Sequence, residues 1–453
     1  AMANSFLNEL LQTLSERGRG LLGRSRGAPP AENLIALGEQ LLSGRGEASG
    51  VALARLLLEG YAAAEPKARL AFLTALGEKF GADPAKVEAA IAGFQRSPSQ
   101  AAMQALHLAA EPPRQELMRR LNLAPGGTAA LVRIREELLG HIAAEPALQP
   151  VDEDFTHLFA SWFNRGFLVL RPIDWTTPAN ILERIIRYEA VHRIGGWEDL
   201  RRRLEPSDRR CFAFFHPQLV DEPLIFVEVA LTREIPDAIA PLLAAERVAI
   251  PAEETTTAVF YSISNTQRGL AGVSFGDFLI KQVVEDLQRS LPNLKTFVTL
   301  SPVPGFAAWL TLQRAGGSES EFLDEAAAAA LAGLDDPAWP EDGAKAEALR
   351  RPLLAAAAHY FLKAKLSSGL PADPVARFHL RNGARLERIN FMADLSRRGL
   401  DQAHGLMTNY LYDLDQIEKN HEAFAAEGRF TAAPAVRKLL LTPAPARRRG
   451  AAT

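Results

Sequence analysis

The hydrophobic pattern of the sequence changes near residue 150, and this change limits the possible folds more than any other feature. Before it, leucines recur at helical spacing and strand signals are nearly absent. One stripe, at i, i+3, i+4 and i+7, consists of Leu7, Leu10, Leu11 and Leu14. Further stripes surround Leu37 and Leu56, and helix starts such as Asp83-Pro84 separate the segments. Residues 1–150 are therefore predicted to form an all-helical bundle of six to eight helices.

After this point, aromatic and β-branched residues become dense, and short apolar runs alternate with helical segments. Four runs are predicted to be buried strands: Cys211 to His216, Leu224 to Leu231, Ala258 to Ser264 and Thr296 to Leu300. Helices are predicted over Ala179 to Arg203 and over Asp277 to Leu291. The alternation predicts a mixed α/β domain over residues 151–453, with an alanine-rich helical insertion near 318–365, and an α+β class for the whole chain.

A third pattern, "RFHLRNGARLERINFMA", places two runs of extended appearance around Asn382-Gly383. Asn-Gly between two such runs is the strongest short signal of a β-hairpin. His379 is therefore predicted to lie on a strand, with its imidazole on one face and the side chains of Phe378 and Leu380 on the other.

The totals limit the classes of function. The chain has 453 residues, 47% apolar and 23% charged, as expected of a soluble globular protein with two or three domains. A formal charge of −3 gives no large field for nucleic acid or an anionic membrane, so neither is expected as a partner. One cysteine, Cys211, excludes an internal disulfide, and no spacing of cysteines or histidines predicts a metal site. With no apolar run of about 20 residues to span a bilayer, a cytoplasmic protein is expected.

One predicted strand ends in a glycine-bearing loop that leads into a helix. The stretch is "FYSISNTQRGLAGVSFGDFLIKQVVEDL", and its loop holds Gly269, Gly272 and Gly276. Unpaired backbone N–H groups at such a loop and helix start can bind a phosphate. The dinucleotide and Walker patterns are absent, which leaves another kind of pyrophosphate, with Arg268 and Lys281 as cationic candidates. Packing alone accounts for such glycines equally well, and both cations also fit a solvated surface.

Polar residues in apolar surroundings give the candidate catalytic groups. In "TFVTLSPVPGFAAWL", Ser301 follows a predicted strand and precedes two prolines that restrict the backbone. It fits either an aimed hydroxyl or an ordinary turn serine, and without GxSxG around it an α/β-hydrolase nucleophile is not expected. His379, His216 and His192 are the candidate imidazoles, and their spacing does not rank them.

Several blocks of the sequence resemble the malonyl-CoA decarboxylase family. They are "ERIIRYEAVHRIGGWEDLRRRL", "CFAFFHPQLVDEPLIFVEVALT", "FYSISNTQRGLAGVSFGDFLIK", "LSPVPGF", "PVARFHLRNGARLERINFMADLSRRG" and "GLMTNYLY". In this order they extend from about Phe155 to Tyr412. The resemblance implies a helical N-terminal domain used in self-association, so a homo-oligomer is expected. It also implies a C-terminal catalytic domain similar to the GCN5-related N-acetyltransferase fold.

The resemblance also implies the positions of the site. The family's serine and histidine map onto Ser301 and His379 as the catalytic residues. The CoA pyrophosphate would bind the loop from Gln267 to Asp277, which departs from the acetyltransferase pattern at Leu270. The residues expected to bind CoA are Gln267, Arg268, Gly269, Ala271, Gly272, Val273, Ser274, Phe275, Gly276, Asp277, Lys281, Asn409 and Tyr412.

The implied reaction is decarboxylation of malonyl-CoA to acetyl-CoA and CO₂ through a thioester enolate. Because the thioester is itself the electron sink, no cofactor and no metal are expected. His379 would protonate the enolate carbon or stabilise its oxygen, with Ser301 as its polar partner. The basic run from Arg201 to Arg210 fits either the CoA 3′-phosphate or a solvated helix end. Two alternatives stay open, an acyl-CoA-dependent N-acyltransferase and a non-catalytic CoA-binding scaffold.

Overall fold

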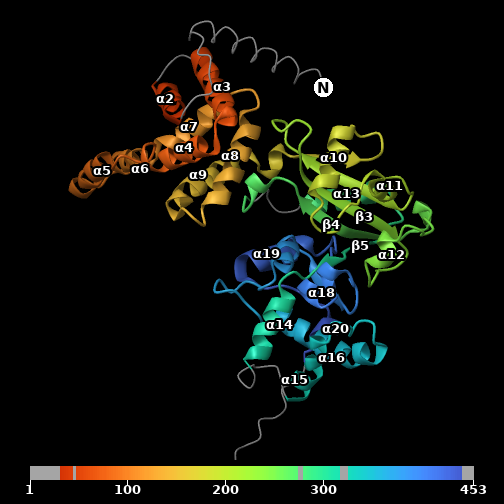
Figure 1. The fold of residues 1–453 in the computed structure, drawn as a ribbon. Helices are drawn as coiled ribbons and strands as arrows, with labels where there is room; N and C mark the ends of the chain where they lie inside the picture. Colours follow the sequence, from red (N-terminus) through yellow and green to blue (C-terminus); the bar gives the residue numbers. More distant parts are fainter. Residues whose placement is uncertain (1–30, 44–46, 274–278, 317–324, 441–453) are drawn as a thin grey trace, which may run out of the picture. The chain divides into compact units, whose positions relative to one another are not determined.

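The computed structural model describes residues 31–43, 47–273, 279–316 and 325–440 (Figure 1). The predicted helix around Leu7 to Leu14 lies outside these residues. The chain divides into two compact units. Unit 1 comprises Ala1–Val169, His216–Glu222 and Gln267–Phe275, and unit 2 comprises Leu170–Phe215, Pro223–Thr266 and Gly276–Thr453. No helix of the described segments is long and apolar enough to cross a membrane.

Helices make up most of the described part of unit 1 (Figure 1). They are α2 Ala31–Leu42, α3 Glu47–Ala63, α4 Pro66–Glu78, α5 Pro84–Arg96, α6 Gln100–Ala110, α7 Pro113–Asn122, α8 Gly127–His141 and α9 Gln149–Trp162. Proline begins α4, α5 and α7, where its missing N–H has no intrahelical partner to lose. The Asp83 carboxylate accepts from two amides of the first turn of α5, and the Ser99 hydroxyl accepts from one amide of α6, that of Ala102.

Unit 2 is built on an eight-stranded mixed sheet. Its strands are β1 Val169–Ile173, β2 Arg209–Phe215, β3 Pro223–Thr232, β4 Thr257–Asn265, β5 Thr296–Thr299, β6 Ser301–Pro302, β7 Arg385–Asn390 and β8 Met407–Leu411. The order is β1-β2-β3-β4-β5-β8-β6, with β7 also pairing with β8. β4 and β5 are parallel, whereas β2–β3, β3–β4, β5–β8, β6–β8 and β7–β8 are antiparallel. The predicted α+β class and all four predicted strands, which are β2 to β5, are confirmed.

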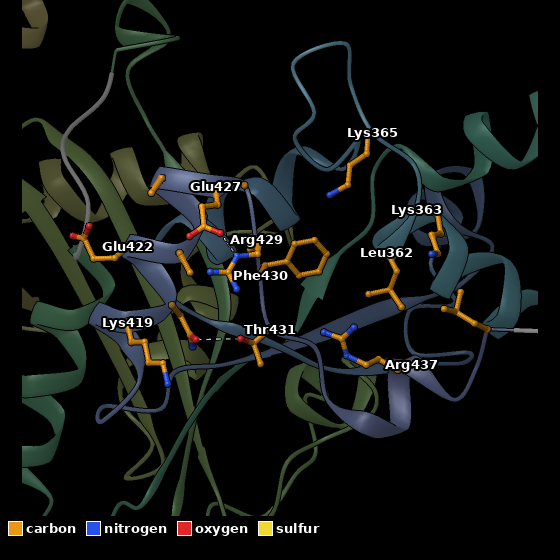
Figure 2. Close-up of a pocket in the computed structure, with 15 residues that line it drawn as sticks. Leu362, Lys363, Lys365, Lys419, Glu422, Glu427, Arg429, Phe430, Thr431 and Arg437 are labelled. Atoms are coloured by element: carbon orange, nitrogen blue, oxygen red, sulfur yellow. Dashed lines mark hydrogen bonds and ion pairs between the residues drawn. The ribbon is translucent and has the colours of Figure 1, made fainter.

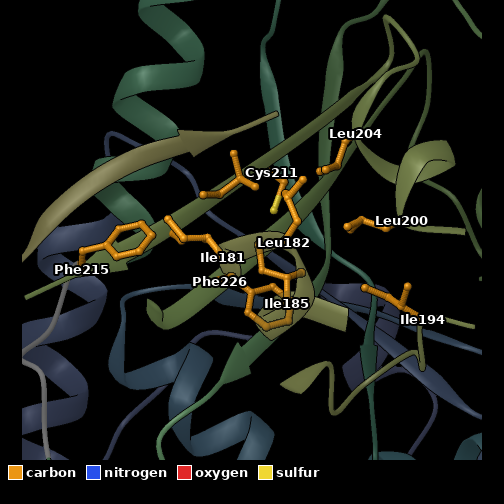
Figure 3. Packing of buried hydrophobic residues seen from close by; sticks show 11 residues of the cluster. Ile181, Leu182, Ile185, Ile194, Leu200, Leu204, Cys211, Phe215 and Phe226 are labelled. Atoms are coloured by element: carbon orange, nitrogen blue, oxygen red, sulfur yellow. The ribbon is translucent and has the colours of Figure 1, made fainter. Parts of the chain in front are cut away.

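Helices of unit 2 alternate with these strands along the chain. They include α10 Ala179–Tyr188 and α11 Trp197–Leu204, and farther along the chain α13 Leu279–Ser290, α14 Phe306–Ala315, α15 Glu325–Leu331, α16 Gly343–Leu362, α17 Pro374–Arg381, α18 Arg397–Ala403, α19 Ile417–Glu427 and α20 Pro434–Arg437. Figure 3 shows the cluster that α10 and α11 form against the sheet: Ile181, Leu182, Ile185, Ile194, Leu200, Leu204, Cys211, Phe215 and Phe226. Cys211 is therefore a core residue, and burial raises the pKa of its thiol.

Two predictions of secondary structure are wrong. The helix predicted over Ala179 to Arg203 is two helices, because the chain breaks after Tyr188 and crosses Gly195-Gly196, where Gly196 has φ +147°. The hairpin predicted at Asn382-Gly383 is instead the end of helix α17, followed by β7.

The Asn-Gly pair ends a helix for the same reason that it could turn a hairpin. Gly383 has φ +83°, a left-handed conformation that suits both a hairpin turn and the residue after a helix. Upstream, the Asp373 side chain accepts from the amide of Ala376, and Pro374 begins the helix. These start signals make the preceding run helical, so His379 lies on a helix and not on a strand.

Candidate active site

Ser301 is the first residue of β6, two positions after the end of β5 along the chain. Its strand pairs with β8, opposite Thr408, so sheet pairing fixes the backbone there. The Ser301 side chain is buried, and its Oγ donates to Thr299 Oγ1 over 2.8 Å. The hydroxyl therefore has a defined direction. Ser301 lies on a paired strand and is not the ordinary turn serine that the sequence also allows.

His379 projects from the last turn of α17 into contact with this serine. Its Nε2 lies 3.1 Å from Ser301 Oγ, and its Nδ1 lies 2.8 Å from the hydroxyl of Tyr412. The ring of Tyr410 stacks on the imidazole, with centroids 4.6 Å apart and planes at 25°. The side chains of residues 301, 379 and 412 thus form one continuous hydrogen-bonded row that extends to Thr299.

Burial determines the protonation of this row. His379 is 3% exposed, and desolvation lowers the pKa of its imidazole to about 3. Burial also raises the pKa of the Tyr412 hydroxyl above its ordinary value. At neutral pH the imidazole is therefore uncharged and carries one N–H, so that one ring nitrogen donates while the other accepts. The row can pass a proton along but holds no net charge.

A cavity of about 250 Å³ opens beside Ser301 and His379 in unit 2. Its walls are mostly apolar, and the lining residues are Val191, Phe260, Tyr261, Ile263, Asn265, Ser301, Pro302, Pro374, Val375, Phe378 and His379. No lysine or arginine occurs among these described lining residues. A carboxylate that entered this cavity would lose water without gaining a cation.

Helix α17 is held in place by a buried carboxylate. Asp373 Oδ1 accepts from the amide of Ala376 at 2.7 Å, and Tyr360 donates to Asp373 Oδ2 at 3.4 Å. Burial raises the pKa of Asp373 to about 6, although these hydrogen bonds work in the opposite direction. Asp373 thus fixes the N-terminus of the helix whose last turn carries the imidazole.

The predicted pyrophosphate loop is described from Gln267 to Val273, all within unit 1. Gly269 packs against α8 so closely that an added Cβ would lie 1.9 Å from the carbonyl oxygen of Val132. Arg135 Nη1 donates to the carbonyls of Gly269 and Ala271, both at 2.8 Å. The first glycine of the loop therefore has a packing role.

Amides of the loop are partly engaged in its own turns. Those of Leu270, Ala271 and Val273 donate to loop carbonyls. Gly272, with φ +75°, has open space around its Cα. Arg268 is exposed, and Gln267 donates to Glu222 over 3.3 Å. The predicted contacts at Ser274, Phe275, Gly276 and Asp277 lie outside the described residues.

Two other predicted CoA contacts are engaged within unit 2. Lys281 forms an ion pair of 2.7 Å with Glu418. Asn409 is fully buried: its Oδ1 accepts from Arg388 and Asn390, and its Nδ2 donates to the carbonyl of Thr299 over 2.8 Å. Asn409 therefore holds the strand that leads to Ser301, and it is not among the residues that line the cavity.

The other candidate imidazoles do not join the row of hydrogen bonds. Both ring nitrogens of His216 bond to the backbone, at the carbonyl of Trp162 and the amide of Gln218. His192 is half-buried with its ring centroid 6.4 Å from that of the cavity residue Tyr261, and burial lowers the pKa of its imidazole to about 4. Contact with Ser301 thus distinguishes His379 from both.

The basic run of residues 201–210 is largely engaged inside the protein. Arg201 pairs with Glu205 on the surface of α11. Arg203 is buried and pairs with Glu228 over 3.1 Å, where burial raises the pKa of the carboxyl to about 8. These contacts favour the structural interpretation of the run over a phosphate site.

Sequence reasoning missed Thr299 and Asp373. Thr299 lies two residues before Ser301 in "VTLSP", and residues at i and i+2 on a strand share a face. Asp373 directly precedes Pro374, which is the arrangement of a helix cap. Both signals are present in the sequence, but the predicted hairpin concealed the second.

Comparisons with known proteins agree over most of the chain. A family model described as the malonyl-CoA decarboxylase C-terminal domain matches residues 166–450, and one described as the malonyl-CoA decarboxylase N-terminal domain matches residues 80–163. The chain is 35% identical over 387 residues to a mitochondrial malonyl-CoA decarboxylase of Anser anser anser, which covers 79% of this chain and 76% of that protein. A similar protein of Rattus norvegicus is 34% identical over 412 residues, covering 83% of this chain and 82% of that one.

Solved structures match more closely. The malonyl-CoA decarboxylase of Rhodopseudomonas palustris has a TM-score of 0.88 at 63% identity, and the match covers 90% of this chain and all of that one, 100%. That of Agrobacterium vitis has a TM-score of 0.85 at 58% identity, with the same coverage of 90% and 100%.

Proposed function

This chain belongs to the malonyl-CoA decarboxylase family, and we propose that Ser301, His379 and Tyr412 act together in its conversion of malonyl-CoA to acetyl-CoA and CO₂. The observation that carries the proposal is the 3.1 Å contact between Ser301 Oγ and His379 Nε2 at the wall of an apolar cavity.

The cavity supplies the driving force for loss of CO₂. A malonyl carboxylate placed among Val375, Phe378 and Ile263 would be stripped of water in a space lined by no cation of the described chain. The negative charge is better accommodated after it has moved into the thioester carbonyl, where a hydrogen-bond donor meets it. The C–CO₂ bond breaks, its electron pair forms the enolate, and neutral CO₂ leaves.

The hydrogen-bonded row supplies that donor and then the proton. In one arrangement Tyr412 donates to His379 Nδ1, and Nε2–H donates to Ser301, whose hydroxyl can rotate toward the enolate oxygen. The enolate carbon then takes a proton from Ser301 or His379, and the row is refilled through Tyr412. Because burial keeps His379 neutral, the acid is a neutral N–H or O–H group and not an imidazolium. Solvent provides the one proton consumed per turnover.

The thioester acts as the electron sink, so we propose that the reaction needs no added cofactor. The decisive assay incubates the purified chain with malonyl-CoA alone, without an acyl acceptor, and measures acetyl-CoA and CO₂ by mass spectrometry. Stoichiometric formation of both supports the proposal. Formation of products only when an amine is added would indicate an acyltransferase, and intact malonyl-CoA would indicate a binding protein.

We also propose that the helices of unit 1 mediate self-association. Neither α5 nor α6 has a buried residue, and the pair extends away from the other helices of its unit (Figure 1). Ile91, Met103 and Leu108 are large apolar side chains exposed on this pair by 40%, 46% and 61%. Covering them with a second copy would remove apolar surface from water.

Malonyl-CoA is the proposed partner in a cytoplasmic setting, and nucleic acid is not, because the net charge is only −3.

A further inference from the structure

A second opening in unit 2 lies away from the residues of the active site. It is a groove of about 810 Å³ beside the C-terminal ends of α16 and α19 (Figure 2). None of its lining residues also lines the cavity at Ser301 and His379. Pockets that hold small molecules span roughly 300–1,000 Å³. The groove is therefore a separate space of sufficient size for a metabolite.

Positive side chains outnumber negative ones around this groove. The cations are Lys363, Lys365, Lys419, Arg429 and Arg437, and the carboxylates are Glu422 and Glu427. Glu427 forms an ion pair with Arg429. Four cations then face one carboxylate among the described lining residues.

Helix ends account for only part of this excess. α16 ends at Leu362 and α19 ends at Glu427, and each C-terminus carries about half a negative charge that attracts nearby cations. Five cations less two carboxylates leave three positive charges, and the two helix ends reduce this to about two. The described lining of the groove therefore keeps an excess of about two positive charges.

The groove also offers an apolar face. Lys365 Nζ lies 4.9 Å from the centroid of the Phe430 ring. Figure 2 shows Lys365, Phe430 and Arg437 around one open space, with Leu362 on its far side. A ligand with both an uncharged part and phosphate groups would match this combination.

The sequence that follows the groove does not supply the missing negative charge. Residues 441–453 come directly after Leu440, a lining residue, and contain three arginines and no acidic side chain. Residues 441–453 thus carry no carboxylate side chain that could neutralise the groove. An external anion is the better complement.

We propose that this groove binds a small, multiply charged anion that bears phosphate groups. Such chemistry has two sources, the phosphorylated end of a CoA thioester or a separate phosphorylated metabolite. In both cases the lysines provide the charge, and Phe430 provides the apolar contact.

Calorimetric titration of the full chain with pyrophosphate tests the site itself. Saturable binding is expected, weakening as salt is raised. The variant Lys363→Glu/Lys419→Glu reverses two exposed charges and should weaken binding by at least about tenfold. Lys67→Glu/Lys295→Glu makes the same charge change at exposed positions that do not line the groove, and it should bind like the wild type. Absence of saturable binding to the wild type, or equal affinity in the two variants, would overturn the proposal.

Steady-state kinetics with malonyl-CoA then distinguish the two sources. If the groove holds the end of the substrate, Lys363→Glu/Lys419→Glu should raise KM for malonyl-CoA with kcat unchanged. If it holds a separate metabolite, that variant should lose pyrophosphate binding while KM stays at the wild-type value. Because binding is measured by heat, a negative result is independent of whether the chain decarboxylates malonyl-CoA.

Discussion

Replacement of Tyr412 by phenylalanine tests the relay most directly. The substitution removes only the hydroxyl that lies 2.8 Å from His379 Nδ1, and it keeps the ring that packs edge-on against Phe260. One buried imidazole nitrogen is then left without a partner, which costs about 1–3 kcal/mol. If this cost appears in the transition state, kcat falls by roughly 5- to 150-fold, since about 1.4 kcal/mol corresponds to a factor of ten.

The assay is the initial rate of acetyl-CoA formation over a range of malonyl-CoA concentrations. We expect kcat to fall while KM changes little, because Tyr412 does not line the cavity. Tyr410→Phe is the matched control: this tyrosine contacts the same imidazole by ring stacking, so its variant should keep kcat within about twofold. In the double variant with Ser301→Ala, the loss of transition-state stabilisation should be smaller than the sum of the two single losses in free energy, since both residues act on one row. Wild-type kcat in Tyr412→Phe would refute the reasoning.

Three further predictions concern the same site and its support. Ser301→Ala and His379→Ala should each lower kcat at least about a hundredfold, as expected for loss of one donor to an oxyanion; circular dichroism should show an intact fold, and near-normal turnover in either variant excludes that residue from the mechanism. Gly269→Ala should destabilise the chain, because its Cβ would meet the carbonyl oxygen of Val132 at 1.9 Å; an unchanged melting temperature would contradict this packing. Asp373→Asn keeps a side chain that can cap the helix and removes the carboxyl group, whose pKa of about 6 in the folded protein lies above the ordinary value of 3.8. In the wild type, the neutral Asp373 carboxyl contributes its full stabilisation below pH 3.8, and this contribution is lost as the pH rises through 6. The variant does not titrate, so its free energy of unfolding should gain up to about 3 kcal/mol over that of the wild type at pH 8, and less at pH 5. Urea denaturation at the two pH values measures this, and a pH-independent difference would contradict it.

Sequence patterns predict four of the eight strands, β2 to β5, because each is a short and mostly buried run. The runs from Leu224 to Leu231 and from Ala258 to Ser264 are mostly apolar and almost wholly buried, and they form the central strands β3 and β4. The helix break before Trp197 was harder to foresee, because residues on both sides of it follow a helical period. Asn382-Gly383 was misleading for a related reason, since a left-handed glycine serves helix ends and hairpins alike.

The proposed catalytic pair is implied by the family resemblance and not by the spacing of the residues. Ser301 and His379 are 78 positions apart, so only the tertiary fold could show their contact. The role of Gly269 depended equally on a distant partner, the Val132 carbonyl of α8, which no local pattern reveals. The resemblance implies that Asn409 contacts CoA. In the structure its buried amide bonds to Asn390 and to the carbonyl of Thr299, because a buried amide must satisfy its hydrogen bonds wherever the fold places it.

Burial of His379 links the proposed chemistry of this site to its position in the fold. An exposed histidine would be partly charged near neutral pH, and its cation would stabilise the substrate carboxylate before it leaves as CO₂. The pKa of about 3 at His379 prevents this, because the ring stays neutral beside Tyr410 and Ser301. A neutral row of donors instead favours the state in which negative charge has reached the thioester oxygen. In the proposed mechanism, the same desolvation that weakens the histidine as a base would therefore favour the transition state over the bound carboxylate.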